Sequence, residues 1–406
     1  MDQEKQNNSK GQEQIREEQR DRINPQENLS QDGVSQSNSE TIESKKKSKK
    51  KSWIWWIVVI IIAVIAICGI FFWQKMNKLN QTEIAPDDIE MNEMSDDREA
   101  ILEEYTNIAI FGVDNRDNGH YGSGNSDTII IASINNKTNE VKLVSVYRDT
   151  YLRINDDNRY AKANSAYAYN GAVGGISMLN TNFDLDITKY VSVDWYALVD
   201  AINLLGGIEI EISEAERQKI NEYAPEVERV TGIQTEYLSE SGLVTLDGVQ
   251  ATAYARIRKL AGNDFKRTQR QRIMIEAMFN KVKSSDLSTL NSMLDEIFPQ
   301  IETNLKMNDI LSMGMNVAKY QITSTTGFPF DKSTISLSGI GDCVVPITLE
   351  DNVIKLHDYL FEQDDDTVSN EVYDISNQII ENTGLDLTSP IDTDSYTTGE
   401  EGAEEI

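Results

Sequence analysis

The residues best suited to chemistry lie in one basic run. Residues 256–272 hold seven cations and one anion, in a chain whose formal net charge is −29. The charged residues of the run are Arg256, Arg258, Lys259, Lys266, Arg267, Arg270, Arg272 and the single acid Asp264. Charge runs are usually solvated faces paired with neighbouring acids, so the spacing of the arginines has to decide whether this run binds an anion.

The spacing favours an anion site. Arg256 and Arg258 share one face of a strand predicted over 251–258. Arg267 and Arg270 lie one turn apart at the start of the next predicted helix, which begins at about residue 265. The free N–H groups of a helix N-terminus already favour anions, so arginines placed there repel the helix dipole unless an anion lies between them.

Two aspartates bracket a Gly-rich loop earlier in the chain. Asp114 follows a predicted strand and Asp127 precedes the next one. Carboxylate oxygens so placed suit Mg²⁺ or Mn²⁺ held jointly by protein and phosphate. Two aspartates that only cap turns would give the same spacing, and this alternative stays open.

Two more arginines follow the predicted strands. Arg116 and Arg148 each offer a fork of donors that suits bidentate phosphate binding. Arg148 and the adjacent Asp149 could equally form a local ion pair. The two cysteines predict neither a disulfide framework nor a zinc site, and Cys343 is expected to be an ordinary buried thiol rather than a nucleophile beside His357.

The elements that must position these residues predict an α/β fold. Near-continuous β-branched runs at 107–114, 129–134 and 141–147 are typical of strands covered on both faces. Asn135 and Asn136 predict a hairpin between the second and third runs. Helices are expected at 167–184, 195–205 and from about 265 to 282, and strand 208–212 alternates. We therefore expect a mixed central β-sheet sandwiched by helices, preceded by a single transmembrane helix.

That transmembrane helix is predicted at residues 53–73. Twenty-one uncharged residues span about 31 Å as a helix, close to one hydrocarbon core, and tryptophans flank both ends. Lysines at 45–47 and 49–51 predict a cytoplasmic N-terminus and an extracellular body in the plasma membrane. A cleavable signal peptide is the competing interpretation, which the length of the preceding segment disfavours.

Composition assigns the remaining segments. Residues 1–52 are predicted to be a disordered cytoplasmic tail, and residues 74–104 an extracellular stalk. Residues 361–406 contain fourteen acids and no base, which predicts an acidic disordered tail. The acidic body argues against nucleic acid as a partner, since a nucleic-acid binder presents a broad basic face.

Several motifs in this order resemble the LytR–CpsA–Psr family of bacterial cell-wall proteins. The matching stretches are NIAIFGVDNRD (107–117), SDTIIIASIN (126–135), VSVYRDTYLRI (144–154), KANSAYAYNG (162–171), YVSVDWYALVDAINLLGGIEI (190–210) and LDGVQATAYARIR with NDFKRTQRQR (246–272). The resemblance implies a catalytic domain over 105–282 and a C-terminal extension of that domain over 283–360.

The resemblance also implies a function. Members move a glycopolymer such as teichoic acid or capsule from an undecaprenyl-pyrophosphate carrier in the membrane to a peptidoglycan sugar hydroxyl. The roles it implies are a Mg²⁺ site at Asp114 and Asp127, a catalytic set of Arg148, Arg256, Arg258, Asp264, Arg267 and Arg270, and substrate contacts from Arg116, Asp149, Lys162, Asn164 and Gln271.

Two other functions remain possible from the same residues. A non-enzymatic sensor could bind the lipid or the wall polymer at this site without an acceptor groove. A polyprenyl pyrophosphatase would use water in place of the sugar hydroxyl. Detection of a transfer product with a purified acceptor glycan separates these alternatives from the transferase.

Overall fold

The computed structural model describes residues 80–113, 121, 124–258, 263–363 and 367–392 of the 406-residue chain. The predicted tail 1–52 and transmembrane segment 53–73 lie outside the described residues. Within the part of the chain that is described, no helix combines the length and the apolar character that a membrane crossing requires.

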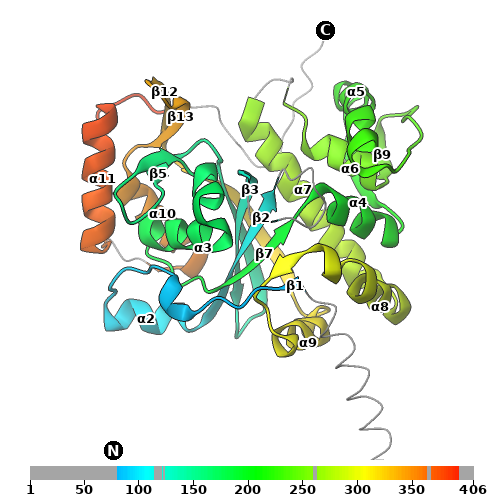
Figure 1. Ribbon diagram of the computed structural model, residues 1–406, viewed down its shortest axis with the longest axis horizontal. Helices are drawn as coiled ribbons and strands as arrows, with labels where there is room; N and C mark the ends of the chain where they lie inside the picture. Colours follow the sequence, from blue (N-terminus) through cyan, green and yellow to red (C-terminus); the bar gives the residue numbers. More distant parts are fainter. Residues whose placement is uncertain (1–79, 114–120, 122–123, 259–262, 364–366, 393–406) are drawn as a thin grey trace, which may run out of the picture. The chain divides into compact units, whose positions relative to one another are not determined.

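A seven-stranded mixed sheet forms the centre of the fold (Figure 1). In spatial order its strands are β1 (Asn80–Gln81), β10 (Glu302–Thr303), β7 (Lys189–Val193), β2 (Tyr105–Val113), β3 (Ser126–Asn135), β4 (Glu140–Val146) and β11 (Gln321–Phe328). β2, β3 and β4 are antiparallel neighbours, whereas β7 pairs parallel with β2, and β11 pairs parallel with β4. The predicted mixed sheet is confirmed, and so is the hairpin between β3 and β4.

Helices cover both faces of this sheet, as the strand composition predicts. Successive residues of β3 face opposite ways: Ile129 and Ile131 join one core cluster, while Ile130 joins another with Ile275. The first cluster includes α3 (Asn164–Phe183), α10 (Leu349–Phe361) and α11 (Asn370–Thr383). The second contacts α7 (Asn263–Ser284), so the sheet lies between these two layers (Figure 1).

Helix α3 lies directly against β2 because a glycine permits it. A Cβ built on Gly175 would come within 2.7 Å of the Phe111 ring, which is fully buried in β2. The same helix is kinked at Asn170 and Gly171, and Gly171 has a φ of +56° that L side chains rarely adopt. The close packing at Gly175 therefore holds the part of α3 that follows the kink against β2.

A second, helical part follows β7. It contains α4 (Trp195–Leu204), α5 (Glu214–Thr231), α6 (Gly248–Ala255) and the antiparallel pair β8 (Ile208–Ile212) and β9 (Gly242–Leu246). These elements share a core cluster with Met274 of α7, which ties them to the helix that carries the second half of the basic run. The helical part therefore supports both ends of that run (Figure 1).

The strand predicted over residues 251–258 is wrong, because this stretch belongs to helix α6 and the turn after it. All eight residues of α6 are buried, so no amphipathic period marks the helix in the sequence. A capping box starts it: the Asp247 side chain accepts from the Gln250 backbone, and the Gln250 side chain accepts from the Asp247 N–H. Arg256 is the C-cap of α6 and not a strand residue.

The remaining elements complete the unit. They are α2 (Asp96–Leu102), α8 (Leu287–Glu296), α9 (Met307–Asn316), the 3₁₀ turns η1 (Pro86–Asp88) and η2 (Phe298–Gln300), and the strand pairs β5 (Tyr151–Arg153) with β6 (Tyr160–Lys162) and β12 (Lys332–Leu337) with β13 (Gly341–Pro346). Strand β11 lies in the predicted C-terminal extension, yet it pairs with β4 along its whole length. The extension is thus part of the central sheet.

Two segments expected to be unstructured are folded. Helix α11 lies within the predicted acidic tail 361–406 and buries Val372, Ile375 and Ile379 at spacings of three and four residues. Helix α2 lies within the predicted stalk 74–104 and buries Leu102. In α11 an apolar stripe outweighs the polar composition of its surroundings, whereas α2 buries Leu102 and Arg98.

The place of α11 in the core can be tested by truncating Ile375, which is 1% exposed. Ile375→Ala is expected to lower the free energy of unfolding by about 2–5 kcal/mol, because it leaves a cavity in the core cluster that α11 joins. Tyr373→Ala is the matched control, since Tyr373 is 50% exposed on the same helix. Equal urea midpoints for both variants and the wild-type protein would show that α11 adds nothing to the fold.

Candidate active site

The end of the β3–β4 hairpin brings Asp127 and Arg148 together. Ile129 pairs with Val146 in the antiparallel register, so the first residues of β3, which include Asp127, lie at the same end of the sheet as the residues just after β4. The Arg148 Nη1 donates to the Asp127 Oδ1 at 2.8 Å. Arg258, which follows α6, places its Nη2 3.4 Å from the other carboxylate oxygen, Oδ2. One carboxylate therefore joins two arginines from distant stretches of chain.

Arg148 is held on its other side by Asp149 and Lys162. The Arg148 Nε lies 3.4 Å from the Asp149 Oδ2, and the Lys162 Nζ lies 3.0 Å from the Asp149 Oδ1. The Asn164 backbone N–H donates to the Arg148 carbonyl at 3.0 Å, at the start of α3. Both alternatives for Arg148 are therefore present: it forms the local ion pair with Asp149 and also reaches Asp127.

Arg256 leaves the end of α6 and lies over an aromatic ring. Its guanidinium carbon is 3.8 Å from the centroid of the Trp195 ring, at the start of α4. Its Nη2 lies 3.2 Å from Glu226 Oε2 of α5. The stacking ring and the carboxylate fix the plane of this guanidinium, which stays partly exposed.

Helix α7 carries the other predicted site residues on its buried side. Arg267, Arg270 and Gln271 are all less than 9% exposed. The Arg270 Nε donates to Glu216 Oε1 of α5 at 2.7 Å, and its Nη1 donates to the Ile257 carbonyl at 3.4 Å. Arg270 is therefore engaged within the protein and is not open to solvent, unlike the clamp that the sequence predicts.

The structure describes only part of the predicted site. Asp114 and Arg116 lie outside the described residues, and so does the side chain of Asp264, whose backbone belongs to the first turn of α7. Of the remaining predictions, Arg148, Arg258 and Asp127 meet at one point. Asp149, Lys162 and Asn164 surround Arg148.

The structure describes one of the two predicted metal ligands, Asp127. Asp127 is a hard oxygen donor with a side chain one-third exposed, which suits Mg²⁺, but both oxygens contact guanidinium groups here. Among the described residues, no group of three or more His, Cys, Asp or Glu side chains gathers as a metal centre would. Asp127 fits a metal only as one ligand of a set that phosphate oxygens and Asp114 would complete.

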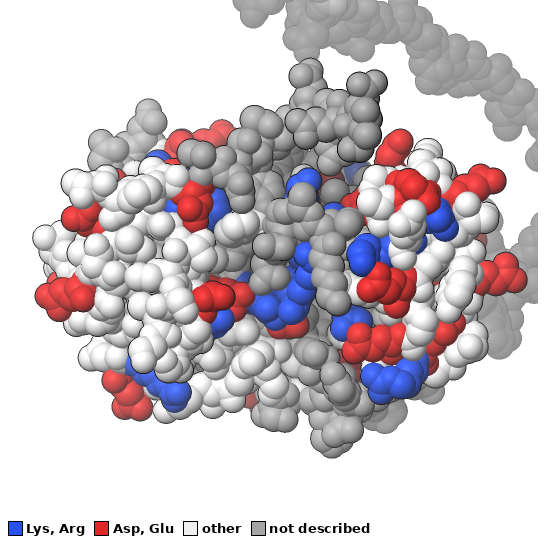
Figure 2. Space-filling model, turned by 90° about the horizontal axis from the view of Figure 1, so that it is seen from above, with Lys and Arg blue, Asp and Glu red and all other residues white. Residues whose placement is uncertain are grey.

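Sequence reasoning missed the partners that α4 and α5 supply. Trp195, Glu216 and Glu226 all contact predicted arginines, but they lie 30 to 61 residues away from them in the chain. Only the capping-box pattern of Ser213 and Glu216 was visible, and it predicts a helix start but no arginine contact. Figure 2 shows basic side chains near the middle of one face with acidic side chains beside them, as such pairing requires.

Cys343 does not form a nucleophilic pair with His357. Cys343 in β13 is fully buried, and burial raises the pKa of its thiol, so the thiolate is disfavoured at neutral pH. The His357 Nε2 contacts the Phe183 carbonyl instead.

A cavity of about 570 Å³ near the N-terminus of α6 is lined by residues such as Glu236 and Asp247. None of the predicted site residues lines that cavity.

The Asp127 carboxylate competes with any anion for Arg148 and Arg258, which gives a direct test. In metal-free buffer, Asp127→Asn is expected to tighten the binding of inorganic pyrophosphate about two- to fivefold, the worth of a partly exposed ion pair. Titration calorimetry measures the affinity. Glu381→Gln makes the same charge change on the exposed side of α11 and should leave the affinity unchanged. Weaker binding by Asp127→Asn would mean that Asp127 orients the arginines and does not compete.

Comparison with known proteins shows which proteins this chain is similar to. A family model described as the LytR_cpsA_psr family matches residues 71–340. The Enterococcus faecalis protein named polyisoprenyl-teichoic acid–peptidoglycan teichoic acid transferase TagU is 30% identical over 211 residues, covering 52% of this chain and 64% of that protein. The Oceanobacillus iheyensis TagU is 30% identical over 245 residues, covering 58% of this chain and 69% of that protein. The chain thus spans less than two-thirds of the length of the Enterococcus relative.

A solved structure shows the same fold. A Streptococcus agalactiae protein superimposes with a TM-score of 0.54 at 21% identity, covering 69% of this chain and 95% of that protein. The family model matches well over half of the chain, and the resemblance found in the motifs is confirmed. The chain belongs to the LytR–CpsA–Psr family.

Proposed function

We propose that this protein is a membrane-anchored extracellular phosphotransferase that moves a glycopolymer of the teichoic acid or capsule type from an undecaprenyl-pyrophosphate carrier to a cell-wall sugar hydroxyl. The observation that carries the proposal is the Asp127 carboxylate shared by Arg148 and Arg258. The names of the TagU relatives, which specify a polyisoprenyl-linked teichoic acid and peptidoglycan, support the donor and the acceptor.

The chemistry suits a site built from guanidinium groups. The acceptor hydroxyl oxygen attacks the phosphorus that carries the glycopolymer, a phosphodiester forms, and the bond to the second phosphate breaks. Polyprenyl phosphate leaves with the electron pair of that bond. Phosphoryl transfer depends on positioning and on neutralising charge that spreads over the phosphate oxygens, which Arg148, Arg256 and Arg258 provide.

The acceptor proton needs a base, because arginine stays protonated. The Asp264 carboxylate or an oxygen of the leaving phosphate would take it. Gln271 and Arg267, on the buried side of α7, would complete the pyrophosphate contacts with Arg116, and Lys162 would hold Asp149 and so Arg148. Asp114 and Asp127 would bind Mg²⁺, or Mn²⁺ in its place, which supplies further neutralisation of phosphate charge when bound.

The location follows from the same proposal. The polyprenyl carrier is a membrane lipid, so the arginines must lie close to the outer face of the bilayer. An anchor at residues 53–73, with the N-terminus in the cytoplasm, would hold them there.

The transferase proposal is tested by removing one guanidinium of the shared pair. Arg258→Ala is expected to lower transfer from a lipid-linked glycopolymer to a purified peptidoglycan acceptor about a hundred- to thousandfold, because charge in the transition state loses a donor. Product formation by the full chain in detergent is the measurement. Arg229→Ala, at an exposed arginine in the last turn of α5, is the control. Undiminished turnover in Arg258→Ala would refute the proposal. Release of polyprenyl phosphate by the wild-type protein without an acceptor would assign a pyrophosphatase.

The metal proposal has its own measurement. Chelation with EDTA is expected to abolish transfer, because the phosphate charge then lacks one of its counter-ions. Addition of Mg²⁺ or Mn²⁺ should restore transfer. Ca²⁺, which prefers a larger oxygen cage, should restore less. Full turnover in the presence of excess chelator would show that the arginines act without a metal.

A further inference from the structure

Glu216 of α5 uses both carboxylate oxygens. Its Oε2 accepts from the Ser213 N–H at 3.0 Å and from the Ser213 hydroxyl at 3.0 Å, which closes the capping box of α5. Its Oε1 accepts from the Arg270 Nε at 2.7 Å. The side chains of Glu216 and Arg270 are 16% and 7% exposed, so the pair is largely removed from water.

Arg270 passes this constraint to the segment that carries two site arginines. Its Nη1 donates to the carbonyl of Ile257, the residue between Arg256 and Arg258. Ile257 also buries its side chain completely. Helix α6 ends at Ala255, and the Arg256 and Ile257 N–H groups still donate to carbonyls of α6, so the Arg270 contact to the Ile257 carbonyl adds a second anchor for the backbone of this short segment.

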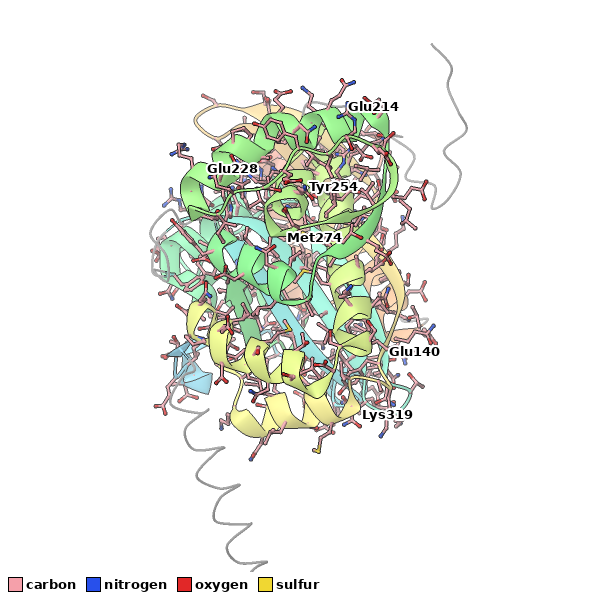
Figure 3. The ribbon with its side chains drawn as sticks, turned by 90° about the vertical axis from the view of Figure 1, so that its right-hand side faces the viewer. Glu140, Glu214, Glu228, Tyr254, Met274 and Lys319 are labelled. Carbon is pink, nitrogen blue, oxygen red and sulfur yellow. The ribbon has the colours of Figure 1, made fainter. Side chains whose placement is uncertain are left out.

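The same contacts give Arg270 a role other than phosphate binding. Its Nε and Nη1 contact a carboxylate and a carbonyl, and its guanidinium lies 5.9 Å from the Tyr254 ring (Figure 3 labels Tyr254 on α6). A pyrophosphate that took these donors would leave the Glu216 charge buried and unpaired, which is costly. Arg258, by contrast, is 43% exposed and faces Asp127.

We propose that Glu216 is a positioning residue that acts through Arg270 to orient the Arg256–Arg258 segment toward the pyrophosphate headgroup. This inference rests on the proposed function, because it takes pyrophosphate binding as the reason for the orientation of the Arg256–Arg258 segment. The chain of contacts is Glu216 on α5, Arg270 on α7, the Ile257 carbonyl, and then the two arginines on either side of it.

The chain offers a matched control for Glu216. Glu214 lies in the same first turn of α5, and it pairs with Arg217 of its own helix at 2.6 Å (Figure 3 labels Glu214). Glu214→Gln and Glu216→Gln therefore remove the same charge from the same helix end. Only the second change removes a charge and an acceptor oxygen from the contact to α7.

The experiment uses the full chain in detergent, with inorganic pyrophosphate for binding and a lipid-linked glycopolymer for turnover. Glu216→Gln is expected to weaken pyrophosphate binding and to lower kcat/KM about ten- to hundredfold, the effect of losing a buried charge-assisted hydrogen bond. Glu214→Gln should stay within about twofold of the wild-type protein. Unfolding is followed in parallel, so that affinity is compared between folded proteins.

A purely structural role predicts a different result. If Glu216 only stabilises α5, Glu216→Gln lowers the unfolding midpoint but leaves the pyrophosphate affinity of the folded protein at the wild-type value, and this outcome overturns the inference. If Glu216→Gln does not fold, Arg270→Lys serves instead, because it keeps the charge and loses the fork that joins Glu216 to Ile257. Wild-type affinity in a folded Arg270→Lys protein also overturns it.

A double variant tests the route through Arg270. In an Arg270→Lys background, Glu216→Gln is expected to cause little further loss, since the contact it removes is already disrupted. Fully additive losses would contradict an action through Arg270.

Arg258→Ala in the same assays separates the two proposals. If Arg258→Ala keeps wild-type turnover, the proposed function fails. If Arg258→Ala is inactive while Glu216→Gln behaves as wild type, only the positioning role fails.

Discussion

The Asp127 carboxylate lies between two guanidinium groups that would otherwise repel each other. Arg148 and Arg258 come from segments more than a hundred residues apart, and both contact that shared anion. Guanidinium groups cannot discharge by losing a proton, so their convergence needs negative charge between them. The Asp127 carboxylate supplies this negative charge here. A pyrophosphate is the ligand whose two phosphates would best replace that charge or add to it.

The rest of the structure can be understood as what holds these two arginines at one point. The antiparallel register of β3 and β4 fixes Arg148 beside Asp127, and Asp149 with Lys162 holds it from the other side. The helical part between β7 and α7 fixes the segment that carries Arg258. Carboxylates of α5 anchor the arginines next to it, which explains why a basic run can exist in so acidic a body.

The sequence allowed three strands of the central sheet, β2, β3 and β4, to be predicted because β-branched runs buried on both faces are almost continuously apolar, and the β3–β4 hairpin has a clear turn signal. Helix α6 was mistaken for a strand, because a helix buried on all sides lacks an amphipathic period. An anion site was predicted from the type and spacing of the arginines, although the strand expected to place Arg256 and Arg258 on one face is a helix followed by a turn. Their partners Trp195, Glu216 and Glu226 were not, since local sequence does not encode which distant side chain will contact a given guanidinium.

The central claim is that Arg148 and Arg258 serve one anion together. A crystal structure of the protein with bound pyrophosphate tests it most directly. The account requires both guanidinium groups within hydrogen-bonding distance of the same diphosphate, beside Asp127. Pyrophosphate bound elsewhere, with both arginines still paired to the Asp127 carboxylate alone, would contradict it.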